Sequence, residues 1–370
     1  MAQYYRIPLK KNEPSSKYSW EEKLIIHKNI ARSKYGRLVE KEPLKDVATE
    51  PVTDYDNDIG YYGPATLGGQ KFQLLFDTGS ADLWVPKVSY NNGTKTKHST
   101  FDPEKLDTFK TDNKSFSITY GTGHTSGVAA TDTFEFAGFS IKDQAFGLAD
   151  TVSDDFTNAP FDGILGMAFD QLSELQAPTP FQNLINNHSV SSSVFGFVLG
   201  RAEDGTNGNS ELTIGGVDPK FSNNIKYNKV VNRRGFWQIA LGGAQVNDKT
   251  VDVKGGEAII DTGTTLVIIP PEDADAIHNA IPGAKKQGQN YLIPTNSKAV
   301  VAFTFGGVTY NINPADMTVD DVGNGLSVSG IQGENMPGME NTWLVGDVFL
   351  KNVFNAYDVN KSAVGFAPLE

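Results

Sequence analysis

A short pattern that occurs twice constrains the fold of this chain more than any other feature. Residues 74–80 read Leu-Leu-Phe-Asp-Thr-Gly-Ser, and residues 258–264 read Ala-Ile-Ile-Asp-Thr-Gly-Thr. Much further along the chain, each copy has a matching segment of two apolar residues and a glycine. The two glycines are Gly166 and Gly346, which lie 89 and 85 residues after the respective aspartates. A single Asp-Thr-Gly is also typical of an aspartate that caps a turn, but two copies with matching downstream glycines predict two homologous lobes.

The repeat predicts a specific chemistry at the junction of the lobes. A pseudo-twofold axis brings equivalent positions together, which would place the Asp77 and Asp261 carboxylates close to one another. Two carboxylates at short range share one proton, because both cannot ionise cheaply. The pair then holds a base that activates a water and an acid that protonates the attacked carbonyl oxygen, without a metal or another cofactor. Neighbouring glycines would permit close backbone approach, and neighbouring hydroxyls would orient the carboxylates (Gly79, Gly263, Ser80 and Thr264).

Composition narrows the function classes. The 370 residues are more than one core usually spans, which also favours two lobes. A net charge of −12 disfavours nucleic acid as a partner, and no apolar run approaches the roughly 20 residues that span a bilayer. The chain has no cysteine, which excludes disulfides, thiol catalysis and cysteine-ligated zinc.

Beyond residue 52 the chain is typical of an all-β protein. Short segments rich in Phe, Val, Ile and Thr are bounded by Gly, Asn, Asp or Pro, and we expect them to be strands. Helical windows are few, and residues 181–188 and 272–280 are two of them. The expected strands include residues 72–76, 115–120, 194–199, 211–214 and 299–305.

The N-terminal arm differs from the body in charge. Residues 1–47 carry a net charge of about +5 and the remainder about −17, which indicates that the arm and the body bind one another. A solvated basic tail is the alternative. A capping box at Ser19 would open a helix on which Trp20, Leu24 and His27 share one face. The first residues lack the apolar stretch of a signal peptide.

These motifs together resemble the pepsin family of aspartic endopeptidases, most closely its fungal, rhizopuspepsin-type members. Residues 77–86 and 260–265 are similar to the two catalytic signatures, and residues 161–166 and 344–350 to the paired motifs behind them. Residues 118–123 resemble the flap hairpin. The resemblance covers essentially the whole chain. It implies a bilobal all-β fold with a β-hairpin flap, and peptide hydrolysis by a water held between two aspartates.

The resemblance also implies roles for individual residues. The two aspartates would be the catalytic pair, and Thr78 and Thr262 would cross-link the loops that carry them. Tyr120 would lie at the flap tip with its hydroxyl toward Trp84, although Trp84 also fits a packing role. Backbone hydrogen bonds to an extended substrate would come from the flap and the second loop (Gly121, Thr122 and Gly263). The flap tyrosine would line the main apolar subsite with three residues that also fit a plain core (Leu75, Phe161 and Ile164).

The basic arm resembles a pepsin-type pro-segment. Lys34 would lie between the catalytic carboxylates, and Tyr35 would also occupy the site. Carboxylates paired with the arm at neutral pH become protonated in acid, so we expect the arm to leave in acid and to be cleaved near residues 40–52. The chain would then consist of an inhibitory pro-segment, a lobe with Asp77 and the flap, and a lobe with Asp261 (residues 1–47, 48–220 and 221–370).

Two departures from the family pattern affect the expected function. Many fungal relatives carry Asp two residues after the flap tyrosine, which helps them accept Lys before the scissile bond, whereas this chain has Thr122. We therefore expect weak cleavage after Lys and a preference for large apolar or aromatic residues. Relatives commonly have disulfides and this chain has none, so secretion, or a vacuolar location as second choice, is inferred from the resemblance alone. We expect a monomer that acts on proteins and peptides and binds its own pro-segment, with no nucleic-acid or membrane partner.

Other classes fit the sequence less well. A phosphoryl-aspartate enzyme would not explain the duplication, and a two-carboxylate glycosidase would not explain the flap and the arm. Gly-x-Ser-x-Gly, Walker A and Gly-x-Gly-x-x-Gly motifs are absent from the sequence, and its five histidines show no metal-ligand spacing. The remaining alternative is a catalytically inactive member of the same fold that binds peptides or acts as an inhibitor.

Overall fold

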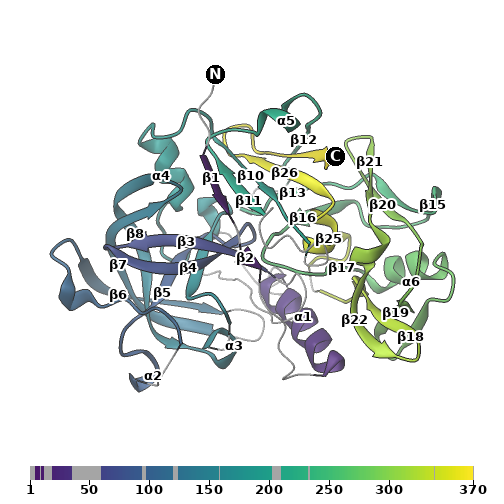
Figure 1. Ribbon diagram of the computed structural model, residues 1–370, viewed down its shortest axis with the longest axis horizontal. Helices are drawn as coiled ribbons and strands as arrows, with labels where there is room; N and C mark the ends of the chain where they lie inside the picture. The colour runs from purple at the N-terminus through teal and green to yellow at the C-terminus, as the bar shows by residue number, and fades with distance from the viewer. Residues whose placement is uncertain are drawn as a thin grey trace.

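The structure is a computed structural model, and strands in five sheets are the main secondary structure of the part of the chain that it describes. Figure 1 shows two lobes side by side, one formed by the first half of the chain and the other by the second half. The prediction of an all-β bilobal fold is confirmed. The described residues are 5–8, 10–11, 19–35, 60–93, 97–119, 124–157, 159–201, 210–231, 234–336 and 338–369.

One eight-stranded sheet forms the framework of the first lobe. Burial alternates along β3, because successive side chains point to opposite faces of the sheet. The end of β4 is buried on both faces, as expected for a central strand beside two neighbours. The strands follow the order β2 (Lys10–Lys11), β3 (Tyr61–Leu67), β4 (Gln70–Asp77), β9 (Gly163–Gly166), β5 (Leu83–Pro86), β8 (Phe139–Val152), β7 (His124–Phe136) and β6 (Lys110–Thr119).

Three sheets form the second lobe. The central one has the order β13 (Gln238–Ala240), β16 (Glu257–Ile260), β25 (Thr342–Val345), β17 (Val267–Ile269) and β24 (Ile331–Gly333). A second sheet contains β15 (Lys249–Val251), β14 (Gly243–Val246), β20 (Val301–Phe305) and β21 (Val308–Ile312). A third contains β18 (Lys285–Gln287), β19 (Asn290–Pro294), β23 (Leu326–Ser329) and β22 (Thr318–Gly323).

The two lobes repeat the same strand arrangement around the candidate site. In the first lobe β4 is parallel to β9, β9 is antiparallel to β5, and β5 is parallel to β8. In the second lobe β16, β25, β17 and β24 follow the same sequence of directions. The register pairs Asp77 with Gly166 and Ile260 with Val345. The duplicated sequence pattern therefore corresponds to a duplicated structural unit, as predicted.

A six-stranded sheet joins the lobes and includes part of the N-terminal arm. Its order is β1 (Tyr5–Pro8), β11 (Glu211–Ile214), β10 (Val194–Val198), β26 (Val353–Asp358), β27 (Ala363–Pro368) and β12 (Lys226–Lys229). Since β1 pairs with β11 along all four of its residues, the arm supplies an edge strand to this sheet. The arm also supplies β2, which pairs with β3 of the first lobe.

Helices are short apart from α1 (Trp20–Tyr35). The capping box is present, because Glu22 N donates to Ser19 Oγ at 3.3 Å and Ser19 N donates to Glu22 Oε2 at 2.7 Å. Figure 1 shows α1 between the lobes, next to β22. None of the described helices is long and apolar enough to cross a membrane. The other α-helices are α2 (Tyr90–Gly93), α3 (Asp154–Thr157), α4 (Pro180–Asn186), α5 (Pro219–Ser222), α6 (Pro271–Asn279) and α7 (Asp347–Leu350), and the 3-10 helices are η2 (Pro103–Lys105), η3 (Asp170–Leu172) and η4 (Pro314–Met317).

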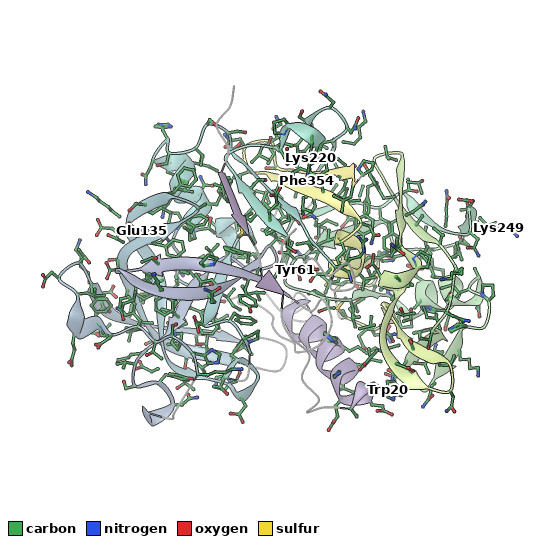
Figure 2. All side chains as sticks on the ribbon, viewed as in Figure 1. Trp20, Tyr61, Glu135, Lys220, Lys249 and Phe354 are labelled. Atoms are coloured by element: carbon green, nitrogen blue, oxygen red, sulfur yellow. The ribbon has the colours of Figure 1, made fainter. Side chains whose placement is uncertain are left out.

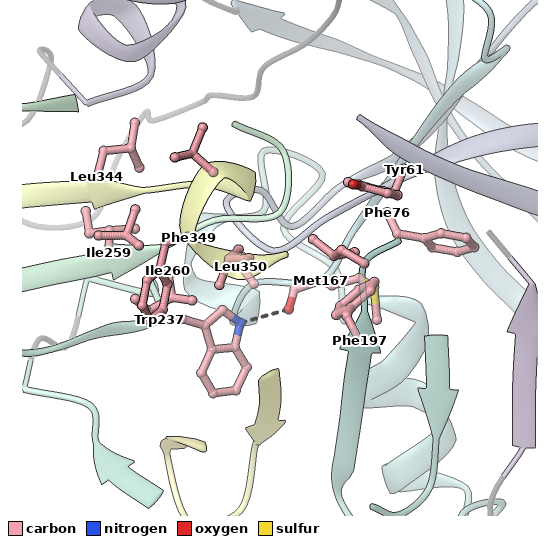
Figure 3. Packing of buried hydrophobic residues seen from close by; sticks show 14 of the residues in the cluster. Tyr61, Phe76, Met167, Phe197, Trp237, Ile259, Ile260, Leu344, Phe349 and Leu350 are labelled. Atoms are coloured by element: carbon pink, nitrogen blue, oxygen red, sulfur yellow. Dashed lines mark hydrogen bonds between the residues drawn. The ribbon is translucent and has the colours of Figure 1, made fainter. Parts of the chain in front are cut away.

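The main apolar core continues from one lobe into the other (Figure 3). Trp237, in the segment that leads into the second lobe, is fully buried, and its indole N–H donates to Met167 O of the first lobe at 3.0 Å. Its ring also contacts Phe169 at 4.1 Å between centroids. This continuity fixes the two lobes against each other, and with them the two loops that follow β4 and β16.

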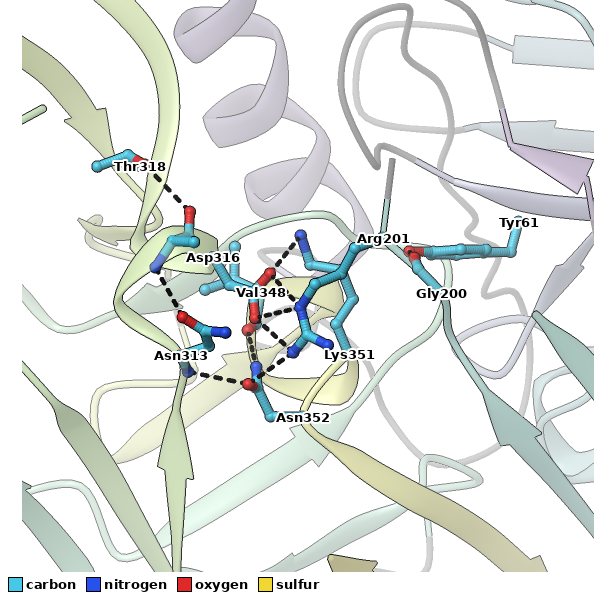
Figure 4. Close-up of polar contacts among 10 residues, drawn as sticks. Tyr61, Gly200, Arg201, Asn313, Asp316, Thr318, Val348, Lys351 and Asn352 are labelled. Atoms are coloured by element: carbon cyan, nitrogen blue, oxygen red, sulfur yellow. Dashed lines mark hydrogen bonds and ion pairs between the residues drawn. The ribbon is translucent and has the colours of Figure 1, made fainter. Parts of the chain in front are cut away.

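A polar network reinforces the junction on another side (Figure 4). Arg201, which follows β10, binds both carboxylate oxygens of Asp316 with three hydrogen bonds of 2.7 to 3.0 Å. Lys351 forms a second ion pair with Asp316 at 3.2 Å. The side chains of Asp316 and Lys351 are only 3% and 7% exposed. A buried carboxylate is thus compensated by two cations from different parts of the chain.

Candidate active site

The structure brings Asp77 and Asp261 together at the junction of the lobes. Asp77 ends β4, Asp261 directly follows β16, and both side chains are fully buried. A Cβ placed on Gly263 would lie 2.2 Å from Asp77 Oδ1 and 3.3 Å from Asp261 Oδ1. The two carboxylates therefore face one another across a backbone position where only glycine fits.

Each carboxylate is held by the same two groups of its own loop. Gly79 N donates to Asp77 Oδ1 at 2.8 Å, and Ser80 Oγ donates to Asp77 Oδ2 at 2.6 Å. In the second lobe Gly263 N donates to Asp261 Oδ1 at 3.0 Å, and Thr264 Oγ1 donates to Asp261 Oδ2 at 2.6 Å. Hydrogen bonds of this kind fix the plane of a carboxylate before a substrate arrives. The donors are the two hydroxyls expected to orient the carboxylates, Ser80 and Thr264, together with the backbone amides of the two neighbouring glycines, Gly79 and Gly263.

Two threonines cross-link the loops. Thr78 N donates to Thr262 Oγ1 at 3.1 Å, and Thr262 N donates to Thr78 Oγ1 at 3.0 Å. Each hydroxyl also donates to the backbone of the opposite loop, Thr78 to Ile260 O at 3.1 Å and Thr262 to Phe76 O at 2.9 Å. These four symmetrical bonds are buried, so they keep a fixed separation between the two aspartates.

The repeated apolar-apolar-Gly motif supports the loops from behind. A Cβ on Gly166 would lie 2.4 Å from Asp82 N, and a Cβ on Gly346 would lie 1.9 Å from Thr264 O. Backbone from the aspartate loop therefore passes directly over each glycine, where no side chain fits. Close backbone packing is the physical reason that both positions are glycine, and the repeat of the lobe places them at similar offsets after the two aspartates.

Tyr357 lies behind the pair and was not identified from the sequence. It is fully buried on β26 and stacks on Phe195 at 4.9 Å between ring centroids. Burial raises the pKa of its hydroxyl well above the usual value; the nearby Thr78 side chain opposes this shift, and the charges of Asp261 and Asp347 add to it. The hydroxyl is therefore neutral, and it adds no charge to the site.

An apolar cluster lies beside Asp77 and includes the residues expected in the subsite. Leu75, Trp84, Phe161 and Ile164 belong to this cluster, and all four are buried. Trp84 contacts Phe156 edge-on, with 5.2 Å between ring centroids. The other members could not be singled out from the sequence, because burial on a strand or helix face does not reveal which cluster that face joins (Tyr90, Phe116, Ile118, Ala149, Val152, Phe156 and Ala159).

The flap is described only along its two arms. β6 and β7 pair antiparallel up to Thr119 and His124, which is the hairpin expected at this position. Tyr120, Gly121 and Thr122 lie outside the described residues, so their expected contacts stay predictions.

Helix α1 is seated on the second lobe. Leu24 and His27 are buried, and they line a small cavity with Leu266, Val319 and Val328. Figure 2 shows Trp20 at the outer end of the helix.

Charged groups of α1 also bind the body. Lys23 forms an ion pair with Asp320 at 3.2 Å. Lys28 Nζ donates to Gln289 O at 2.7 Å and to Asn290 Oδ1 at 3.0 Å. This part of the arm is therefore not a solvated tail. Lys34 and Tyr35 are in the last turn of α1, but their side chains lie outside the described part of the chain.

Among the residues that the structure describes, no group of three His, Asp or Glu side chains is arranged to hold a metal ion. The site consists of carboxylates, hydroxyls and backbone amides.

Two lobes that present paired carboxylates on cross-linked loops define the pepsin-like class of folds. Residues 60–369 match the family model described as eukaryotic aspartyl protease. The chain therefore belongs to the eukaryotic aspartyl protease family.

Curated relatives extend over most of the chain. A probable aspartic-type endopeptidase CTSD of Arthroderma benhamiae is 39% identical over 318 residues, which is 84% of this chain and 61% of that protein. Rhizopuspepsin of Rhizopus chinensis is 33% identical over 374 residues, covering 98% of this chain and 92% of the relative. Chymosin of Ovis aries is 32% identical over 373 residues, covering 99% and 95%. The chain thus spans about three-fifths of the Arthroderma relative and nearly all of the other two.

Proposed function

We propose that this protein is an aspartic endopeptidase that hydrolyses peptide bonds at acid pH, with Asp77 and Asp261 as its catalytic residues. The observation that carries the proposal is the symmetrical setting of the two buried carboxylates, each fixed by a glycine amide and a hydroxyl of its own loop. Curated relatives that are named as aspartic-type endopeptidases support it.

The proposed reaction needs one proton shared by the pair. One aspartate is ionised and takes a proton from a water, whose oxygen attacks the peptide carbonyl carbon. The other is protonated and gives its proton to the carbonyl oxygen. The tetrahedral intermediate then collapses: the first aspartate gives the proton it took from the water to the amide nitrogen, the second takes a proton back from a hydroxyl of the intermediate, and the C–N bond breaks to leave a carboxylic acid and an amine. The proposed enzyme is therefore active at acid pH, because the two aspartates need one shared proton and lose it at higher pH.

We propose that large apolar or aromatic residues of the substrate occupy the cluster beside Asp77. Leu75, Phe161 and Ile164 supply apolar surface at this position. The flap would cover an extended substrate through its backbone, so recognition depends little on sequence outside the apolar positions. Thr122 replaces the acidic residue that would favour Lys, and cleavage after Lys is expected to be weak.

We propose that residues 1–47 are an inhibitory pro-segment, followed by lobes at 48–220 and 221–370. The basic charge of the arm, its two paired strands and the seating of α1 on the second lobe support this division. Similarity to rhizopuspepsin covers 98% of the chain and so includes most of the arm. In this proposal Lys34 lies between the aspartates and Tyr35 beside them, and acid releases the arm.

The proposed setting is a monomer that is secreted, or else held in a vacuole-like compartment. Its partners would be protein and peptide substrates and its own pro-segment.

The test is a pH series of cleavage of a denatured protein after acid incubation, with and without pepstatin. We expect acid-only activity that pepstatin abolishes, and shortening of the chain between residues 40 and 52 by mass spectrometry. Asp77→Asn and Asp261→Asn should each lower kcat/KM at least about a thousandfold, whereas Asp143→Asn, on an exposed carboxylate paired with Lys110, should not. Shortened protein without activity at any pH would instead support an inactive peptide-binding member of the family.

A further inference from the structure

Asp82 is a buried carboxylate that the proposed reaction does not use. It lies five residues after Asp77, directly before β5, and it is 6% exposed. Its backbone belongs to the catalytic framework, because Gly166 N donates to Asp82 O at 3.0 Å. The side chain points elsewhere, toward a loop more than 90 residues later in the sequence.

Three groups of that loop donate to the Asp82 carboxylate. Ser173 Oγ donates to Oδ1 at 2.7 Å, Leu175 N donates to Oδ1 at 3.2 Å, and Glu174 N donates to Oδ2 at 2.9 Å. The pKa of Asp82 is raised above its usual value, because the effect of burial outweighs the opposing effect of these three donors. The ionised carboxylate accepts all three bonds without placing a proton of its own against a donor.

The bound segment is a tight turn whose tip contacts the apolar cluster. Gln176 N donates to Ser173 O at 3.3 Å, and Gln176 has a positive φ of 54°, so the turn needs support from outside. Leu175, within this turn, packs against the cluster that contains Leu75, Trp84 and Phe161. The carboxylate therefore determines where one apolar side chain of that cluster lies.

We propose that Asp82 is a positioning residue for substrate selectivity, which holds Leu175 in place as a wall of the apolar subsite. This inference rests on the proposed assignment of the cluster to the substrate. It assigns no chemical step to Asp82, which would act only through the turn at residues 173–176.

The test compares acid-activated enzyme variants on matched peptides that carry Phe, Leu or Ala at the position filling the cluster. Asp82→Asn keeps the shape but places an amide donor against at least one of the three donors. We expect it to lower kcat/KM for the Phe peptide about tenfold, mainly through KM, and to change the Ala peptide less than about twofold. Leu175→Ala, like Asp82→Asn, should lower the ratio of kcat/KM for the Phe peptide to that for the Ala peptide. The double variant should lose little more than either single variant, because both act on one wall.

Two further variants make each result decisive. Ser173→Ala removes one donor and should give a smaller loss of the same kind, so the inference stays testable even if Asp82→Asn does not fold. Phe161→Ala tests the subsite itself. If Phe161→Ala changes selectivity while the Asp82, Ser173 and Leu175 variants do not, the inference is overturned and the proposed subsite stands. If none of them changes selectivity, both are overturned, and an equal loss of kcat for every peptide would likewise contradict a positioning role.

Discussion

Replacing His27 tests how acid releases the proposed pro-segment. His27 lies on the face of α1 that is seated on the second lobe, in a small cavity whose body side is lined by Leu266, Val319, Val328 and the carboxylate residue Asp320. Burial lowers its pKa from 6.5 to about 4, and the neighbouring positive charge of Lys23 contributes. Other charged groups near it are Lys28 on the same helix and Asp320 on β22, which is paired with Lys23.

The sign of the effect follows from the two pKa values. In a released arm the imidazole takes up a proton near pH 6.5, whereas in the docked arm it does so only near pH 4. The free energy of docking is therefore unaffected by His27 above pH 6.5. It becomes less favourable as the pH falls below that value, and the full penalty is reached below about pH 4. The gap corresponds to roughly 3 kcal/mol, or on the order of a hundredfold in the docking equilibrium.

The measurement uses the whole chain with Asp77→Asn, so that the arm is not cleaved. Hydrogen exchange of the α1 amides, corrected for intrinsic pH dependence, reports docking between pH 7 and pH 3.5. His27→Met replaces the imidazole with an apolar side chain of similar length that has no charge to gain. We expect its arm to remain docked to a lower pH than that of the parent protein. The exposed His188 serves as the control, and His188→Asn should leave the release profile unchanged.

Identical release profiles for His27→Met and its parent would refute the reasoning. Acid release would then come entirely from protonation of carboxylates that face the basic arm. An arm that exchanges freely at every pH would contradict docking itself rather than the part played by His27.

Three further perturbations test the framework of the site. Thr262→Val removes the hydroxyl that accepts from Thr78 N, and we expect a loss of about 2 kcal/mol in urea unfolding together with a lower kcat. Arg201→Met leaves the buried Asp316 with one fewer cation, and unfolding by urea should show a loss of about 3 kcal/mol, with intact stability arguing against the network in Figure 4. Gly346→Ala places a Cβ against backbone at 1.9 Å, so we expect little soluble folded protein, and normal thermal unfolding would contradict that close approach.

The sequence predicted the framework of the site well because its constraints are local and repeated. Each aspartate is held by groups two and three residues later, so a four-residue motif contains both of these donors to its carboxylate. The glycines at 166 and 346 could be found because close backbone packing admits no other residue. The face of α1 was also predictable, since helical spacing alone places Leu24 and His27 together.

The sequence could not predict contacts that depend on how distant segments meet. Ser173 binds Asp82 across 91 positions, and no spacing rule links the two. Phe156 and Trp84 meet in the same way, from a helix and a strand far apart in the chain. Burial of His27 could not be predicted from the helix alone, because the cavity around it is formed by residues of the second lobe such as Leu266 and Val328.

The two lobes are equivalent at the aspartates and differ five residues later, and this difference accounts for two distinct tasks. The residue five positions after Asp77 is Asp82, and the residue five positions after Asp261 is Leu266. Both are buried directly before the next strand, β5 or β17, and both lie beside the glycine that supports the loop. In the first lobe the carboxylate reaches out to fix a turn against the apolar cluster. In the second lobe the leucine forms part of the apolar seat of α1 around His27. A symmetrical framework thus supplies two like carboxylates. Under the proposed function, the polar-to-apolar difference between Asp82 and Leu266 would serve the substrate side in one lobe and the pro-segment side in the other.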